Sequence, residues 1–304
     1  LVPGGAIVCA VVAYSAQSFL SPWNVWMAQL PVLLALTLVW AASDGFAPAL
    51  PGLCATVSWM IQLHAGLAQI GIALALVGSI VWLRSVPRDR RAGAILAAGC
   101  IAFVMWAPPL LEQFAGHGNL GQIVDAMRKP PAIRAGWSIG LRGVEQAVKF
   151  PPAWIHARPD INPLGNPAAV PWWQVVPFLL AVGSVLLFAW RQQRRMLFPQ
   201  AIVLMGCLVA WVACAGVFGP LYHYLIRWVW WLGVLQWILL GSVFVQLVER
   251  AWLKRGDHDE RAREPMVLRR FAAGAVVATL CNGLGFVAYS RPIPERVSLR
   301  LMDV

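Results

Sequence analysis

The stretch WAPPLLEQFAGHGNLGQIVDAMR, residues 106–128, opens the longest polar interval of the chain, which runs on to Pro171. The sequence on both sides consists of apolar runs about as long as a bilayer is thick. Unpaired polar groups that face lipid are costly, so a membrane protein keeps its polar chemistry outside the hydrocarbon or in a protein-lined cavity. We therefore expect function in this interval and in the helix ends that face it.

Composition places the chain among membrane proteins. Hydrophobic residues make up 60% of the 304 residues and charged residues only 12%, whereas about a quarter of the residues in soluble domains are charged. We predict an all-α, polytopic transmembrane helix bundle of about nine spans, since each span needs roughly 17–25 mostly apolar residues. The candidate spans are 4–20, 27–43, 48–63, 67–84, 92–107, 172–190, 197–219, 225–248 and 271–290.

Basic residues gather in three loops, at 84–91, 191–195 and 249–270. If nine spans alternate, these loops share one side of the membrane, which the positive-inside rule makes cytoplasmic. Topology then accounts for the net charge of +11, and nucleic acid is not an expected partner. We predict a multi-pass protein of the bacterial cytoplasmic (inner) membrane. Its parts are helices one to five in 1–107, an extracytoplasmic loop at 108–171, helices six to nine in 172–290 and an extracytoplasmic tail at 291–304.

The extracytoplasmic loop shows helical periodicity in two places. Pro108 and Pro109 are expected to end the fifth span. Beyond them, apolar residues recur at i, i+3, i+4 and i+7 from Leu120, with Asn119 placed as a cap. A second short helix is predicted over 141–150. Both amphipathic helices are expected to lie along the membrane with their apolar sides down, and the proline-rich segment 151–171 to be extended.

Several polar residues reach the predicted outer surface and are candidates for binding a substrate. They are Asn24, Gln62, His64, Gln113, Asn119, Tyr222, His223 and Arg227. A neutral imidazole at His64 can bind a hydroxyl, although a lone histidine at a helix end is more often an interfacial residue. An arginine at the depth of Arg227 is costly unless it snorkels or binds an anion. With His223 one turn earlier, it is placed to hold a phosphate or pyrophosphate.

Glu112 is a weak candidate for catalysis, because burial near the membrane surface would suit a carboxylate to acid or base work. A single carboxylate in a surface loop is, however, usually solvated. The six cysteines are scattered without CxxC spacing, so we expect neither a disulfide framework nor a metal site. No span carries an acidic residue near its middle, which argues against an ion-coupled transporter.

Four short motifs together resemble a known family. They are PWN at 22–24, LP at 30–31, QLH at 62–64 and WAPPLLEQFAGHGNLGQI at 106–123. The combination is similar to actinobacterial-type multi-pass proteins in which the matching pieces are PWNP, QTH, and PPLIDQ followed by PGNL. These resemble the GT-C superfamily of membrane glycosyltransferases. The chain has Leu63 where that pattern has Thr, and Glu112 where it has Asp.

The resemblance implies a polyprenyl-phosphate-linked sugar as donor and a glycan or lipid as acceptor. It also implies an acidic base, often assisted by a divalent cation, in the first outer loop. SPWNVW at 21–26 contains no acidic residue. Since the chain begins at Leu1 directly before an apolar run, we expect it to be the C-terminal part of a longer enzyme whose catalytic carboxylate lies upstream.

The leading hypothesis is therefore that the chain is part of a membrane glycosyltransferase that acts on the outer face. One alternative is an enzyme like the O-antigen polymerases and ligases, which would depend on Arg128, Arg134 or Arg142. Another is a non-enzymatic subunit for lipid or glycan transport or assembly.

Overall fold

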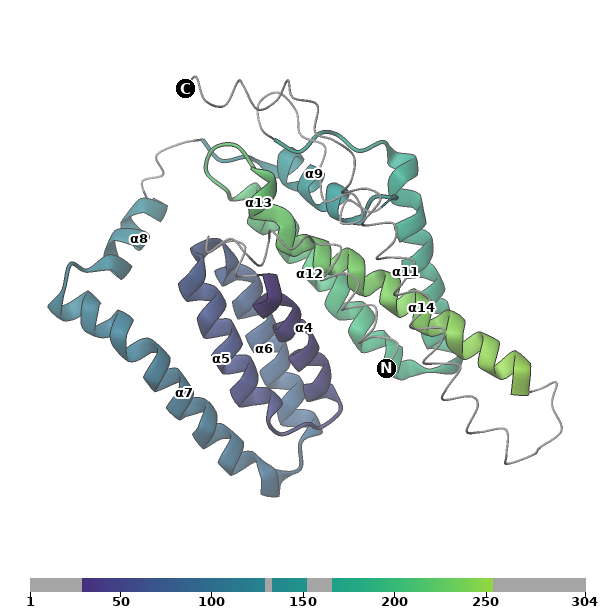
Figure 1. Ribbon diagram of the computed structural model, residues 1–304, viewed down its shortest axis with the longest axis horizontal. Helices are drawn as coiled ribbons and strands as arrows, with labels where there is room; N and C mark the ends of the chain where they lie inside the picture. The colour runs from purple at the N-terminus through teal and green to yellow at the C-terminus, as the bar shows by residue number, and fades with distance from the viewer. Residues whose placement is uncertain (1–28, 129–132, 152–165, 254–304) are drawn as a thin grey trace, which may run out of the picture.

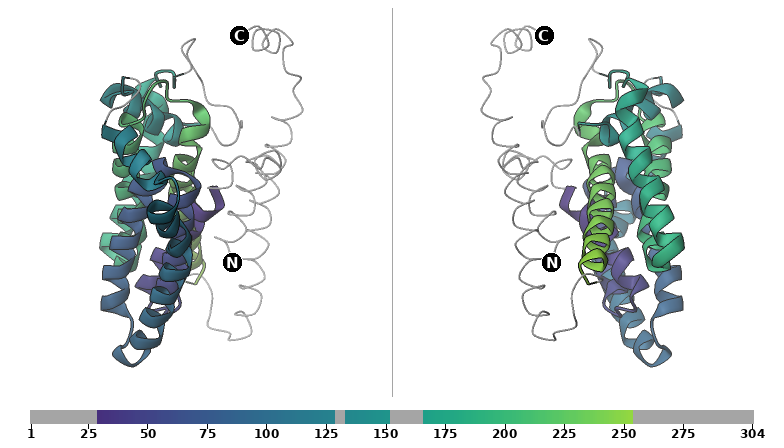
Figure 2. Two further views of the ribbon diagram at one scale, coloured as in Figure 1. Left: turned by 90° about the vertical axis from the view of Figure 1, so that its left-hand side faces the viewer. Right: turned by 90° about the vertical axis from the view of Figure 1, so that its right-hand side faces the viewer.

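The computed structural model describes residues 29–128, 133–151 and 166–253, and every structural statement below refers to these ranges. Their regular structure is helical apart from one isolated β-bridge between Arg134 and Phe218. Seen from the side, the helices form a flattened bundle with roughly upright axes (Figure 2). The predicted spans 4–20 and 271–290, the tail and Asn24 lie outside the described residues.

The first helix group consists of α4 (Gln29–Ser43), α5 (Ala49–Leu63), α6 (Ala68–Ser85) and α7 (Arg88–Ala115). Helices α4, α5 and α6 pack against one another, and α7 lies against α5 (Figure 1). Gly78 lets the α4 and α5 side chains approach the α6 backbone, because a Cβ at this position would collide with Leu53 and crowd Val39. The break between the predicted spans 48–63 and 67–84 is confirmed, since His64 and the short 3-10 helix η1 (Ala65–Leu67) separate α5 from α6.

The second helix group consists of α11 (Trp172–Gln192), α12 (Leu197–Ala215) and α14 (Trp230–Leu253). Three short elements join or precede them: η2 (Arg194–Met196), α13 (His223–Ile226) and η3 (Arg227–Val229). Two fully buried side-chain amides, Gln200 and Gln236, donate to each other across 2.8 and 3.1 Å and link α12 to α14. Helix α12 also packs on α4 and α6, which joins the two groups.

Membrane topology can be compared with these helices. Among the residues that the structure describes, five stretches are long and apolar enough to cross a bilayer: 65–85, 88–115, 172–192, 194–215 and 227–248. Helices α4 and α5 are apolar but have only 15 residues each. The α6–α7 and α11–α12 connections and the end of α14, which carry the basic residues, lie at one end of the bundle, opposite the α5–α6 turn (Figure 1). The protein is thus all-helical and of membrane type, and the number of crossings stays a prediction.

The expectation that Pro108 and Pro109 end the fifth span is wrong, because α7 continues through both to Ala115. Proline has no N–H, so Pro109 leaves the Met105 carbonyl without its helical donor. The side-chain Nε2 of Gln62 on α5 donates to this carbonyl at 3.0 Å. One turn earlier along α5, Ser58 accepts a hydrogen bond of 3.0 Å from Trp106 Nε1. A neighbouring helix thus supplies the hydrogen bond that the proline removes.

Both short helices of the polar interval are present, as α8 (Asn119–Arg128) and α9 (Trp137–Val148). The predicted orientation of the second is wrong, because the apolar side of α9 packs on protein. A Cβ at Gly140 would lie 2.7 Å from the Ala215 nitrogen of α12, and one at Gly233 of α14 would lie 2.5 Å from the Ala147 oxygen. Helix α8 instead packs on α7 and leaves Ile123 and Val124 about half exposed.

Candidate functional site

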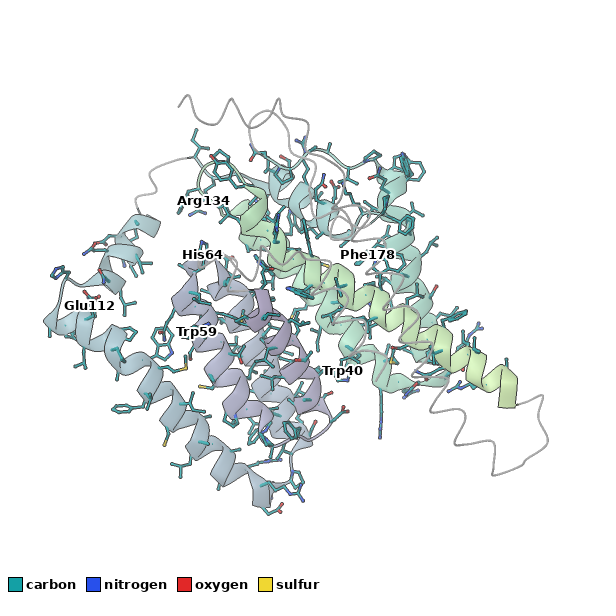
Figure 3. The ribbon with its side chains drawn as sticks, viewed as in Figure 1. Trp40, Trp59, His64, Glu112, Arg134 and Phe178 are labelled. Atoms are coloured by element: carbon teal, nitrogen blue, oxygen red, sulfur yellow. The ribbon has the colours of Figure 1, made fainter. Side chains whose placement is uncertain are left out.

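A small cavity of about 40 Å³ lies where the two helix groups meet, at the end of the bundle that carries His64 (Figure 3). We call this end the outer end, following the predicted topology. Residues from both groups line the cavity. They are Gln29, His64, Gly66, Leu67, Ala213, Cys214, Val217, Leu225 and Trp228. Its volume suits a few water molecules, since one water needs roughly 10–15 Å³ measured in this way.

The turn that His64 begins favours the neutral form of its ring. Its Nδ1 accepts a hydrogen bond of 3.1 Å from the backbone N–H of Gly66. The ring is therefore neutral and carries its proton on Nε2, which makes that atom a donor. Partial burial lowers the pKa of His64 below the ordinary value of 6.5. The imidazole can thus donate one hydrogen bond to a hydroxyl or an anionic oxygen.

Arg227 approaches the same place from the second group. It sits on η3 with only 8% of its surface exposed, and its guanidinium carbon lies 5.4 Å from the centre of the Trp230 ring. The next residue, Trp228, lines the cavity together with His64. Tyr222, just before α13, is 43% exposed and marks the solvent side. The side chain of His223 lies outside what the structure describes.

A second cluster of predicted residues forms a self-contained turn between α7 and α8. The two carboxylate oxygens of Glu112 accept hydrogen bonds from the backbone N–H groups of His117, at 2.9 Å, and Asn119, at 3.0 Å. Gln113 Oε1 accepts from the N–H of Gly121 at 2.9 Å. Helices begin with N–H groups that have no partner within the helix, and these side chains supply such partners. The segment EQFAGHGNLG therefore encodes a capped helix turn.

The structure separates the two clusters. Figure 3 shows Glu112 at the far end of α7, well apart from His64. Trp228, the residue after Arg227, lines one cavity with His64, whereas Gln113 and Asn119 stay with Glu112. Gln62, another of the predicted substrate-binding residues, donates to the Met105 carbonyl of α7.

Sequence reasoning missed several buried polar residues, one of which lines the cavity. Gln29, which lines it, is 2% exposed, and Lys149 at the end of α9 is 7% exposed. Asn166 Oδ1 accepts a hydrogen bond of 2.7 Å from the N–H of Leu221, which holds the segment before Tyr222 in place. Each is a polar residue next to an apolar run, and this pattern is the signal that could have revealed them.

Comparisons with protein-family models, with curated protein sequences and with solved structures give no match. Within the described ranges, no three histidine, cysteine or acidic side chains are grouped to hold a metal ion.

Proposed function

We propose that the outer end around Arg227 binds the phosphate of a polyprenyl-phosphate-linked sugar, and that the protein is part of a membrane glycosyltransferase of the outer face of the bacterial cytoplasmic membrane. The observation that carries this proposal is the position of Arg227, buried beside Trp230 and one residue from a cavity that His64 also lines. The sequence resemblance supplies the sugar carrier and the reaction class.

The chemistry of the site supports an anionic ligand. A guanidinium offers planar, paired donors that match phosphate oxygens, and its hydrogen bonds to an anion are stronger than neutral ones. The surrounding side chains of Trp228, Trp230 and Trp231 are almost fully buried, so water screens the guanidinium charge poorly. His64 Nε2 would add a neutral donor for a sugar hydroxyl or a phosphate oxygen.

In this proposal Glu112 does not provide the acidic base, because both of its carboxylate oxygens accept hydrogen bonds from backbone N–H groups and it lies well apart from His64 (Figure 3). The base that the resemblance implies is therefore expected on a residue other than Glu112. The same observation favours a second candidate, a non-enzymatic subunit for lipid or glycan transport or assembly. Such a subunit needs the anion site but no base, and it would bind carrier without transferring sugar.

The experiment uses the full-length protein in membranes with radiolabelled polyprenyl-phosphate sugars. Arg227→Gln is compared with Arg134→Gln, a matched control, since Arg134 is also at the outer end and stacks on an aromatic ring, Phe218, at 5.5 Å. Losing a charged hydrogen bond worth about 1.5–3 kcal/mol weakens binding by roughly 10- to 100-fold. We expect this loss in R227Q and a change below about threefold in R134Q.

The outcomes separate the candidates. Sugar transfer that R227Q abolishes supports the glycosyltransferase. Carrier binding without transfer by any donor supports the transport or assembly subunit. Transfer that depends on Arg134 and not on Arg227 supports the alternative that resembles O-antigen polymerases and ligases, and overturns the assignment of Arg227.

A further inference from the structure

The cavity beside His64 lies in a seam between separately packed helix groups. The first group contributes Gln29, His64, Gly66 and Leu67, and the remaining lining residues belong to the second group. Each group has its own internal packing, and α12 joins them through α4 and α6. A seam of this kind can admit water if one of its edges moves, because the cavity already has room for a few water molecules.

The His64 side chain holds the edge of the seam. It caps η1 through the hydrogen bond from the Gly66 N–H to Nδ1. The ring lies directly over Gly66, where a Cβ would come within 2.9 Å of Nδ1. An imidazole can accept at Nδ1 only while it is neutral, because both nitrogens of the charged ring are donors. A second proton on His64 would therefore place two donors face to face.

We propose that the His64 turn is an acid-sensitive latch: protonation of the ring breaks the cap on Gly66, releases the 64–67 turn and opens the cavity between the helix groups to water. The proton comes from the outer solution, and no covalent bond changes. The latch is independent of the proposed function, since it requires neither a sugar carrier nor a transfer step.

The groups that face His64 favour the neutral ring. The second group brings Cys214 of α12 and Trp228 of η3 to the cavity that His64 lines, and neither side chain carries an acidic group that would stabilise a charged ring. Helices α4 and α5 contain no charged residue, and the single charge of α6, Arg84, is at its opposite end. Burial lowers the pKa of His64, so the open turn binds a proton more readily than the closed turn. Acid thus favours opening, and the latch is closed above the ordinary pKa of 6.5.

The test uses Cys214 as a reporter, because it lines the cavity and is 2% exposed. The full chain, with serine at its other five cysteines, is placed in lipid vesicles and treated with the water-soluble thiol reagent MTSET at pH 8 and pH 5. The same measurement on H64N is the control, since asparagine can cap the turn and does not titrate. At each pH, the labelling rate of the protein with His64 is divided by that of H64N. This ratio removes the pH dependence of the thiol reaction itself.

We expect this ratio to rise about fivefold from pH 8 to pH 5, the factor that an ordinary side-chain cap represents. An equal ratio at both pH values would overturn the latch. If H64N does not fold, hydrogen exchange of the 64–67 turn in the unaltered protein replaces it. The reference is η2, a 3-10 helix of the same length without a side-chain cap. Loss of protection at 64–67 in acid, relative to η2, supports the latch, and parallel behaviour of the two turns refutes it.

Discussion

The hydrogen bond from Gln62 to the Met105 carbonyl allows a quantitative test of how α7 passes through two prolines. In Gln62→Ala the carbonyl loses its only replacement donor among the described residues, since Pro109 has no N–H. Leaving a polar group unsatisfied in a weakly hydrated place costs about 1–3 kcal/mol. We expect Q62A to lower the free energy of unfolding by about 1–2 kcal/mol, in the lower part of this range because Gln62 is exposed in the bundle.

Pro109→Ala provides the decisive second variant. Alanine restores the N–H that a helix donates to the carbonyl four residues earlier, so the Met105 carbonyl no longer needs Gln62. In the P109A background, Q62A should cost less than about 0.5 kcal/mol, which corresponds to a coupling energy of at least about 0.5 kcal/mol in a double-mutant cycle. Reversible unfolding of the detergent-solubilised protein measures all four variants. Equal costs of Q62A in both backgrounds would refute the reasoning, because Gln62 would then act independently of the proline.

Three further predictions concern packing and the second polar cluster. Gly233→Ala should destabilise the protein by about 1–3 kcal/mol, because its Cβ would meet the Ala147 backbone; thermal unfolding should show no loss in Gly241→Ala of the same helix, where no atom lies within 4 Å. Gln200→Leu should cost about 1–3 kcal/mol by leaving the Gln236 amide unpaired, and adding Gln236→Leu should restore most of that stability in the same assay. Glu112→Ala should speed hydrogen exchange at 116–121 while leaving carrier binding at Arg227 unchanged, and a loss of binding would connect the two clusters after all.

The sequence predicted those features that depend on local periodicity. Leu120 and its repeats placed α8 correctly, and the apolar runs coincide with seven of the described helices. It failed where a partner distant in sequence decides the outcome. Two prolines normally end a helix, but Gln62 compensates from 43 residues away. The apolar face of α9 was recognised and then assigned to the membrane, although Gly140 is a signal for close contact with another helix.

The separation of Glu112 from His64 also changes what the sequence resemblance can support. The most specific of its motifs, WAPPLLEQFAGHGNLGQI, contains the residues that cap the α7–α8 turn, and Glu112 and Gln113 act there through backbone hydrogen bonds. An aspartate could accept similar bonds, so similarity in this motif indicates a similar turn more directly than a similar reaction. The glycosyltransferase proposal therefore depends on Arg227 and not on Glu112. If Glu112→Ala changes only the α7–α8 turn, the proposal stands. If R227Q binds carrier and transfers sugar as the unaltered protein does, the proposal loses its structural basis.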